Sequence, residues 1–248
     1  ARRSNQQKTQ WTGYLRSKGR LGSVDWTVQN TSLLRREGLP GPISRPSNTT
    51  SLATSRSISQ VSASMDGDNI RGSARAVHIF RHERYRDNAS ELGVGAQDQA
   101  DQSQTVGLVV DGQWQAAPRI QANISLRGRL EHLGRRTDAA DAVQSLFRRQ
   151  IATLAVETPV FLINERLVLR PGFTGTWTPQ QPLGWAPQLS ASWMQNERSG
   201  LWMTLGRGFR LPDVWELYGD RGVSVGNPDL RPEFGWRGDV GYAWNKPF

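Results

Sequence analysis

The chain has 248 residues, a formal net charge of +9 at neutral pH, no cysteine and a mean hydropathy of −0.58. No apolar run approaches the ~18–20 residues that a membrane-spanning helix requires, and the lack of cysteine excludes disulfides and thiol chemistry. The positive charge comes from arginines spread over the whole length and not gathered in one stripe, so nucleic-acid binding is not expected. Two classes remain: a soluble β protein, and a membrane β-barrel whose polar lumen lowers the mean hydropathy.

Alternation of apolar and polar residues predicts eleven strands, and no helical periodicity of useful length is present. The expected strands cover about residues 9–17, 22–36, 52–65, 70–86, 103–112, 119–135, 145–163, 166–177, 187–195, 200–210 and 232–244. They share no sequence repeat, which disfavours a propeller. The expected fold class is therefore all-β.

The clearest alternation lies in residues 119–131. One face would carry Ile120, Ala122, Ile124, Leu126, Gly128 and Leu130. The other would carry Arg119, Gln121, Asn123, Ser125, Arg127, Arg129 and Glu131. Because strand side chains alternate between faces, this strand has one apolar wall and one polar wall. Its length of about 40 Å exceeds that of a usual globular strand and is enough to cross a bilayer with tilt. Arg119, Arg127, Arg129 and Glu131 are candidates for a lumen lining that contacts a plug or an anionic ligand, the alternative being a solvated face.

The connections between these strands are expected to alternate between short and long. The short ones are residues 18–21, 66–69, 112–118, 164–165 and 196–199, and the long ones are residues 38–51, 87–102, 137–144, 178–186 and 211–231. An antiparallel up-and-down meander places alternate connections at the same end. Short turns at one end and long loops at the other are typical of outer-membrane barrels. Tryptophan and tyrosine near the expected strand ends fit interfacial girdles, although these residues also favour strands in general.

No catalytic, cofactor-binding or metal-ligating site is predicted. His78 and His82 would be about 13 Å apart on a strand, too far to share one metal ion. Residues 66–69 resemble a calcium loop only faintly and are better explained as a hairpin turn. The chain also lacks a complete glycine-rich phosphate loop and a nucleophile elbow.

A three-part motif stands late in the chain, where an extended run ends, a long connection follows and a new alternating run begins. It consists of Phe209, Arg210 and Pro212, then Glu216, Leu217 and Tyr218, then Asn227, Pro228, Leu230, Pro232 and Glu233. These residues resemble a signature late in the barrel of TonB-dependent outer-membrane receptors. Three elements in the same order within 25 residues make the resemblance fairly specific.

The resemblance implies a sector of about eleven strands from a 22-stranded barrel closed around a plug, located in the outer membrane of a Gram-negative bacterium. Such receptors import scarce nutrients such as iron chelates or cobalamin, and the TonB complex energises them through an N-terminal box. Residues 1–248 are accordingly expected to form a partial barrel domain without plug, TonB box or closing strand, an open half-barrel with two unpaired edges. The alternatives are a passive porin-like or autotransporter barrel, and a soluble β-rich enzyme or carbohydrate-binding protein.

Overall fold

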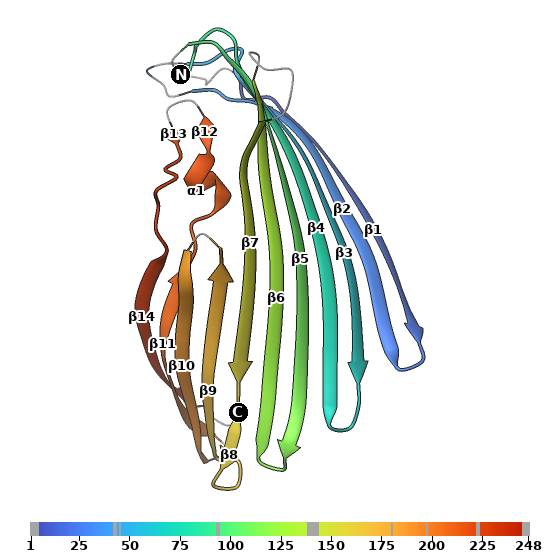
Figure 1. The fold of residues 1–248 in the computed structure, drawn as a ribbon, viewed down its shortest axis with the longest axis vertical. Helices are drawn as coiled ribbons and strands as arrows, with labels where there is room; N and C mark the ends of the chain where they lie inside the picture. The colour runs from blue at the N-terminus through green and yellow to red at the C-terminus, as the bar shows by residue number, and fades with distance from the viewer. Residues whose placement is uncertain are drawn as a thin grey trace.

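The computed structural model describes residues 5–41, 44, 46–92, 95–137, 144–179, 181–196, 198–221 and 224–244. They form one twelve-stranded antiparallel sheet in which strands that follow one another in the chain are neighbours (Figure 1). Eleven strands follow a single path from β1 to β14, and the short β8 pairs beside that path with β6 and β9. The predicted all-β meander of about eleven strands is confirmed.

The strands are long. The elements of the main sheet are β1 (Lys8–Leu21), β2 (Val24–Gly38), β3 (Ser51–Asp66), β4 (Ile70–Asp87), β5 (Gln97–Ala117), β6 (Ile120–Thr137), β7 (Gln144–Glu157), β8 (Val160–Leu162), β9 (Leu167–Thr178), β10 (Gln181–Asn196), β11 (Ser199–Arg210) and β14 (Glu233–Trp244). Between β11 and β14 lie helix α1 (Val214–Tyr218) and a small hairpin of β12 (Asp220–Arg221) and β13 (Ser224–Val225). In the described part of the chain, no helix is long and apolar enough to cross a membrane.

The connections differ in length at the two ends of the sheet, which we call the turn end and the loop end. At the turn end only two or three residues separate β1 from β2, β3 from β4, β5 from β6 and β10 from β11. At the loop end, twelve residues separate β2 from β3, nine separate β4 from β5, and the segment with α1 joins β11 to β14 (Figure 1). The predicted sorting of short and long connections holds at these positions.

Three predicted boundaries are wrong. The expected long loop of residues 178–186 is mostly strand, because a register shift between Gln181 and Gly184 lets β10 pair with β9 around Pro182. The expected strand 145–163 is divided by Pro159, which has no N–H to donate. β5 is much longer than expected at both ends, because its polar residues are held in ladders by β4 and β6 on either side.

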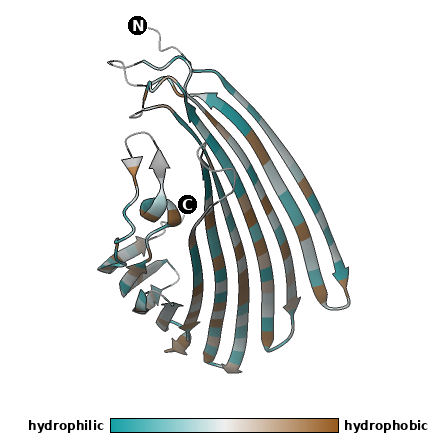
Figure 2. Cartoon of the chain, turned by 45° about the horizontal axis from the view of Figure 1, so that its top comes forward, coloured by the Kyte–Doolittle hydropathy of each residue, from teal (hydrophilic) through white to brown (hydrophobic). Residues whose placement is uncertain are grey.

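The sheet is curved, and its two faces differ in character. Two hollows are lined by residues from β3 to β10 and from β4 to β11, strands far apart in the sheet, so both hollows lie on the concave face. Apolar side chains such as Leu108, Val110 and Leu126 point the other way and are about half exposed on the convex face. The alternation of apolar and polar residues along each strand appears as banding in Figure 2.

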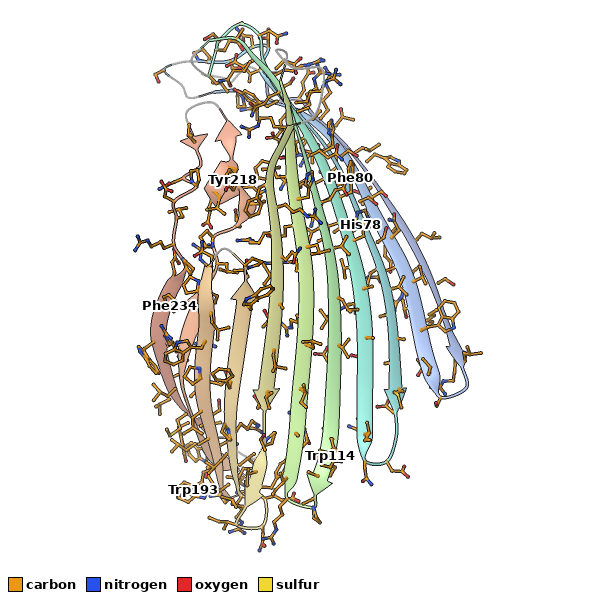
Figure 3. All side chains as sticks on the ribbon, in the orientation of Figure 1. His78, Phe80, Trp114, Trp193, Tyr218 and Phe234 are labelled. Carbon is orange, nitrogen blue, oxygen red and sulfur yellow. The ribbon has the colours of Figure 1, made fainter. Side chains whose placement is uncertain are left out.

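Aromatic rings on both faces lie over glycines of the neighbouring strand, as Trp26 does on the convex face and Trp202 on the concave face. A Cβ at Gly19 would come within 2.6 Å of the ring of its ladder partner Trp26, and one at Gly241 within 2.2 Å of the ring of Trp202. The missing side chain lets each ring lie flat against the adjacent backbone. Trp114 and Trp193 lie near the turn end of the sheet (Figure 3), so large rings mark this border of the apolar surface.

Candidate functional site on the concave face

Residues 211–219, which we call the strap, leave the top of β11 and contain helix α1. Asp213 caps the helix: its Oδ1 accepts the backbone N–H of Trp215 at 2.7 Å and that of Glu216 at 2.8 Å. Glu216 completes a capping box by accepting the N–H of Asp213 at 2.8 Å. This reciprocal cap explains how a helix of only five residues persists in an all-β chain. The motif was interpreted as a plain loop between two strands, so this helix corrects that prediction.

Arg210 joins the three parts of the late motif. Its Nη1 donates to both carboxylate oxygens of Glu216 at 3.0 and 2.9 Å. Its Nε and Nη2 donate to Glu233, the ladder partner of Arg210 at the start of β14, at 3.1 and 2.9 Å. A guanidinium presents its donors in a fixed fork that suits two carboxylates at once. The arginine of the first element therefore binds the glutamates of the second and third elements.

The return segment closes on the same helix. The N–H of Asn227 donates to the carbonyl of Glu216 at 2.8 Å, and Asn227 Oδ1 accepts the N–H of Asp229 at 2.9 Å, which forms a turn over Pro228. At the strand ends, the ring centroids of Phe209 and Phe234 are 5.1 Å apart. The motif residues thus shape and hold the base of the connection. The tip, residues 219–226, was predicted to be its mobile part, and two of its residues, 222 and 223, lie outside the described residues.

Two arginines of the sheet, Arg149, which is buried, and Arg135, which is partly buried, hold the strap by its backbone carbonyls. Arg149 on β7 donates Nη1 to the carbonyl of Pro212 at 2.8 Å, just before α1. Arg135 on β6 donates Nη2 to the carbonyl of Tyr218 at 3.1 Å, at the last residue of α1. The second contact satisfies a helix C-terminal carbonyl that has no partner within the helix. The strap is therefore anchored at both ends of its helix.

Each anchoring arginine is neutralised by a carboxylate of the sheet. Arg149 donates to Glu131 at 2.6 and 2.8 Å, and Arg135 donates to Asp101 at 2.7 Å. Arg149 and Asp101 are buried, with 5% and 3% of their surface exposed. A buried ion pair with its remaining donors satisfied is held firmly, whereas one charge left without its partner is costly.

Apolar and aromatic contacts complete the docking of the strap. Leu217 is buried, and the ring of Tyr218 lies 4.9 Å from that of Phe147 on β7; Figure 3 shows Tyr218 at the loop end, beside β7. The guanidinium of Arg81 on β4 lies 5.3 Å from the ring centroid of Trp215. Since β4 and β11 are far apart in the sheet, these contacts carry the strap across the concave face.

A hollow of about 520 Å³ lies on the concave face and reaches the start of the strap. Its lining includes Val77, Thr105, Arg127, Arg129 and Thr153, with Arg210 and Leu211 at its margin. Of the candidate lumen residues, Arg127 and Arg129 line this hollow, and Glu131 holds Arg149 next to it. Arg119 is separated from them, because it lies in the turn before β6 and not in the strand.

The sequence analysis missed the anchors of the strap. Arg135 is an even number of residues from Arg129 and Glu131 on β6, so its side chain points to the same face. Extending the alternation of residues 119–131 to residue 135 would have added it to the polar face. Arg149 carried no such signal, because β7 has no regular alternation to assign its face. His78 and His82 both lie on β4 at positions whose ladder partners, Val106 and Gln102, belong to the convex face, away from the strap.

Two loop-end connections are joined by a carboxylate. Glu91 accepts hydrogen bonds from the Ser47 hydroxyl at 2.7 Å, from the backbone N–H groups of residues 48–50 at 2.9–3.1 Å and from the Thr50 hydroxyl at 3.0 Å. These bonds, the one from Ser47 first, hold the pKa of Glu91 well below its usual value. The connection after β4 is thereby tied to the connection before β3.

We expect the hydrogen bonds between Glu91 and residues 47–50, which we call the clasp, to persist in mild acid. A lowered folded-state pKa contributes stability above the unfolded value near 4.3, which is lost only when the pH falls through the folded value. Hydrogen exchange at the Thr50 N–H should therefore stay slow from pH 7 to about 4. Glu91→Gln should speed this exchange throughout that pH range, whereas Glu165→Gln, in an exposed turn at the other end, should not. Unchanged exchange in Glu91→Gln would refute the clasp.

The solved structures to which this chain is similar include a transporter and several receptors. The copper transporter OprC aligns with a TM-score of 0.74 at 13% identity, covering 98% of this chain and 44% of its own. A mutant of the ferric enterobactin receptor PfeA from Pseudomonas aeruginosa aligns with a TM-score of 0.71 at 14% identity, covering 98% and 43%. A double mutant of the Serratia marcescens hemophore receptor HasR, in complex with its hemophore HasA and heme, aligns with a TM-score of 0.74 at 14% identity, covering 96% and 42%.

This chain therefore spans less than half the length of the solved structures it resembles. A comparison with curated proteins gave no match. The model of the family described as TonB dependent receptor-like, beta-barrel, matches residues 2–248. Since that match runs through the meander, the strap and the motif that Arg210 holds together, the chain belongs to the TonB-dependent receptor β-barrel family.

Proposed function

We propose that this chain forms a wall sector of an outer-membrane receptor that imports a scarce nutrient by TonB-energised active transport. The family match and the receptor fold support the class of protein. The sheet has two edges, at β1 and β14, that pair with no other described strand. In this proposal, further strands of a barrel of about 22 close on these edges, and a plug occupies the interior.

The observation that carries the proposal is the anchored strap. It crosses the concave face at the loop end and is held by Arg135 and Arg149 through backbone carbonyls. An interior with an internal segment fastened across it suits a gated receptor better than a passive porin-like or autotransporter barrel, which needs an open path. A soluble enzyme or carbohydrate-binding protein is disfavoured by the broad convex surface of exposed apolar side chains, which matches a lipid-facing wall.

The concave face would line the lumen. Arg127 and Arg129 then present positive charge to the interior, where a plug or an anionic ligand could bind them. Arg119 would contribute at the turn end. The titles of the similar structures name copper, ferric enterobactin and heme, which supports a small metal chelate as cargo without selecting one. The partners would be the TonB complex, reached through the plug, and outer-membrane lipid.

Uptake by cells tests this proposal. A strain lacking the complete gene should fail to accumulate one labelled chelate from a panel of siderophores, heme and cobalamin, and the gene should restore accumulation. Disrupting TonB should abolish the restored uptake while leaving the protein in the outer membrane. Uptake that continues without TonB would instead support a passive barrel.

We expect the connection between β11 and β14 to be extracellular. An epitope tag inserted next to Asp220 in the complete receptor should be bound by antibody on intact cells, because the long connections share the loop end. A tag in the short turn at Gly22, at the opposite end, should be reached only after the outer membrane is permeabilised. The reverse labelling pattern would invert the topology.

A further inference from the structure

Arg207 is a cation on the convex face of the sheet. Its neighbour Gly206 is the ladder partner of Gln188, which lines the concave hollow near the turn end. Because side chains alternate along a strand, Arg207 points to the convex face. On that face the ladder partner of Arg207 is Trp236 of β14, which is 68% exposed. Leu205, two residues before Arg207 on β11, lies on the same face. A charged side chain therefore interrupts an apolar surface.

The guanidinium of Arg207 is stacked against two aromatic rings. Its Cζ lies 4.0 Å from the ring centroid of Trp185 and 4.3 Å from that of Phe234, within the range of cation–π contacts. Nη1 also donates to the carbonyl of Trp185 at 3.3 Å. Among the described residues, no carboxylate forms a salt bridge with Arg207. The two rings lie against the guanidinium, and its N–H groups other than the one that binds the carbonyl of Trp185 remain for an acceptor.

The position of Arg207 matches one border of the apolar band. On β10, Trp185 and Trp193 are eight positions apart, and on β14, Trp236 and Trp244 are eight positions apart as well. Eight residues of strand span roughly 26 Å, comparable to the ~25 Å apolar band of an outer-membrane barrel. Figure 3 shows Trp193 near the turn end and Phe234 about halfway up the sheet. Arg207, in register with Trp236, thus lies at the border nearer the loop end.

We propose that Arg207, Trp185, Phe234 and Trp236 form a seat for the phosphate group of a lipid headgroup in the leaflet at the loop end. The inference rests on the proposed outer-membrane barrel. At that depth the available anions are headgroup phosphates, and an arginine without a carboxylate partner is satisfied by a phosphate through charge-assisted hydrogen bonds. The aromatic stack holds the guanidinium in place before the lipid arrives, and Trp236 offers an apolar surface for the adjoining acyl chain.

Lipid binding to the complete receptor, folded in neutral detergent, tests the seat. Native mass spectrometry would titrate phosphatidic acid, with phosphatidylcholine of the same chain length for comparison. Arg207→Gln should weaken the tightest phosphatidic acid site at least tenfold. Arg207→Lys, which keeps the charge but loses the planar stack, should weaken it less. Arg237→Gln is the matched control, because Arg237 adjoins Trp236 on β14 but points to the concave face, and it should bind like the parent.

Three outcomes would overturn the proposed seat. The first is equal phosphatidic acid binding by Arg207→Gln and the parent, and the second is an equal loss of affinity in Arg207→Gln and Arg237→Gln. The third is displacement of the lipid by millimolar inorganic phosphate, which would indicate a site for free anions. A heat-modifiable shift on gel electrophoresis would confirm that each variant is folded before it is compared. The uptake assay separates the two proposals. Normal TonB-dependent uptake with no selective lipid loss in Arg207→Gln would reject only the seat, whereas a receptor that never enters the outer membrane would reject the proposed function.

Discussion

Arg149→Leu should release the strap from the sheet and destabilise the loop end of the barrel by about 3 kcal/mol, the lower end of the range for breaking a buried ion pair. The side chain is 6% exposed, and its removal takes the donor from the carbonyl of Pro212 and one of two arginines from the carboxylate of Glu131. The expected cost is at the lower end because Arg129 still reaches Glu131 at 3.0 Å.

Cysteine labelling and unfolding would measure this effect in the complete receptor. Residues 1–248 contain no cysteine, so Val225→Cys, at a position 75% exposed in the connection just beyond the strap, adds one probe to this part of the receptor. Arg149→Leu should lower the urea midpoint and change the labelling rate at residue 225. Arg148→Leu is the control, because it removes an exposed arginine from the opposite face of the same strand and should alter stability by less than about 0.5 kcal/mol. Similar results for the two variants would show that Arg149 does not anchor the strap.

A double variant would separate the ion pair from the carbonyl contact. Glu131→Gln combined with Arg149→Leu should cost less than the two single changes together, because the second change no longer leaves a buried charge alone. Additive losses would indicate that the two side chains act independently.

Leu126→Arg should cost about 2–4 kcal/mol in the complete receptor if residue 126 lies near the middle of the bilayer, because it places a charge on the lipid-facing wall. Leu126 is 52% exposed on the convex face and lies between Val110 of β5 and Leu154 of β7 in the ladder. A leucine there is surrounded by other apolar side chains across three strands. The expected consequence is reduced folding into lipid vesicles and a lower midpoint of unfolding in urea.

Arg127→Leu, one residue away, should leave folding largely intact. Arg127 lines the concave hollow and donates only to Ser125, at 3.2 Å, among the described residues. The two variants exchange the same pair of residue types at adjacent positions, so their difference depends on the face alone. Equal tolerance of both changes would contradict the assignment of the convex face to lipid.

The alternation of residues by itself determined the fold class, the number of long strands and the composition of the two faces. Strand periodicity is a local property, because consecutive side chains point in opposite directions whatever the rest of the chain does. Leu126 and Arg127 could therefore be assigned to different walls from sequence alone. Proline and glycine were less reliable as signals for the ends of strands where a neighbouring strand supplied the pairing. At Pro182, for example, the register shift in β10 accommodates the proline and the strand continues.

Only the tertiary structure decided how the concave face is closed at the loop end. The contacts of Arg149 with Pro212 and of Arg135 with Tyr218 join residues 63 and 83 positions apart. They depend on the curvature of the sheet and on the path of the strap, neither of which leaves a periodic trace in the sequence. The residues of the late motif could be recognised in the sequence, but their structural role could not. Arg210 binds Glu216 and Glu233 only when β11, α1 and β14 come together in space.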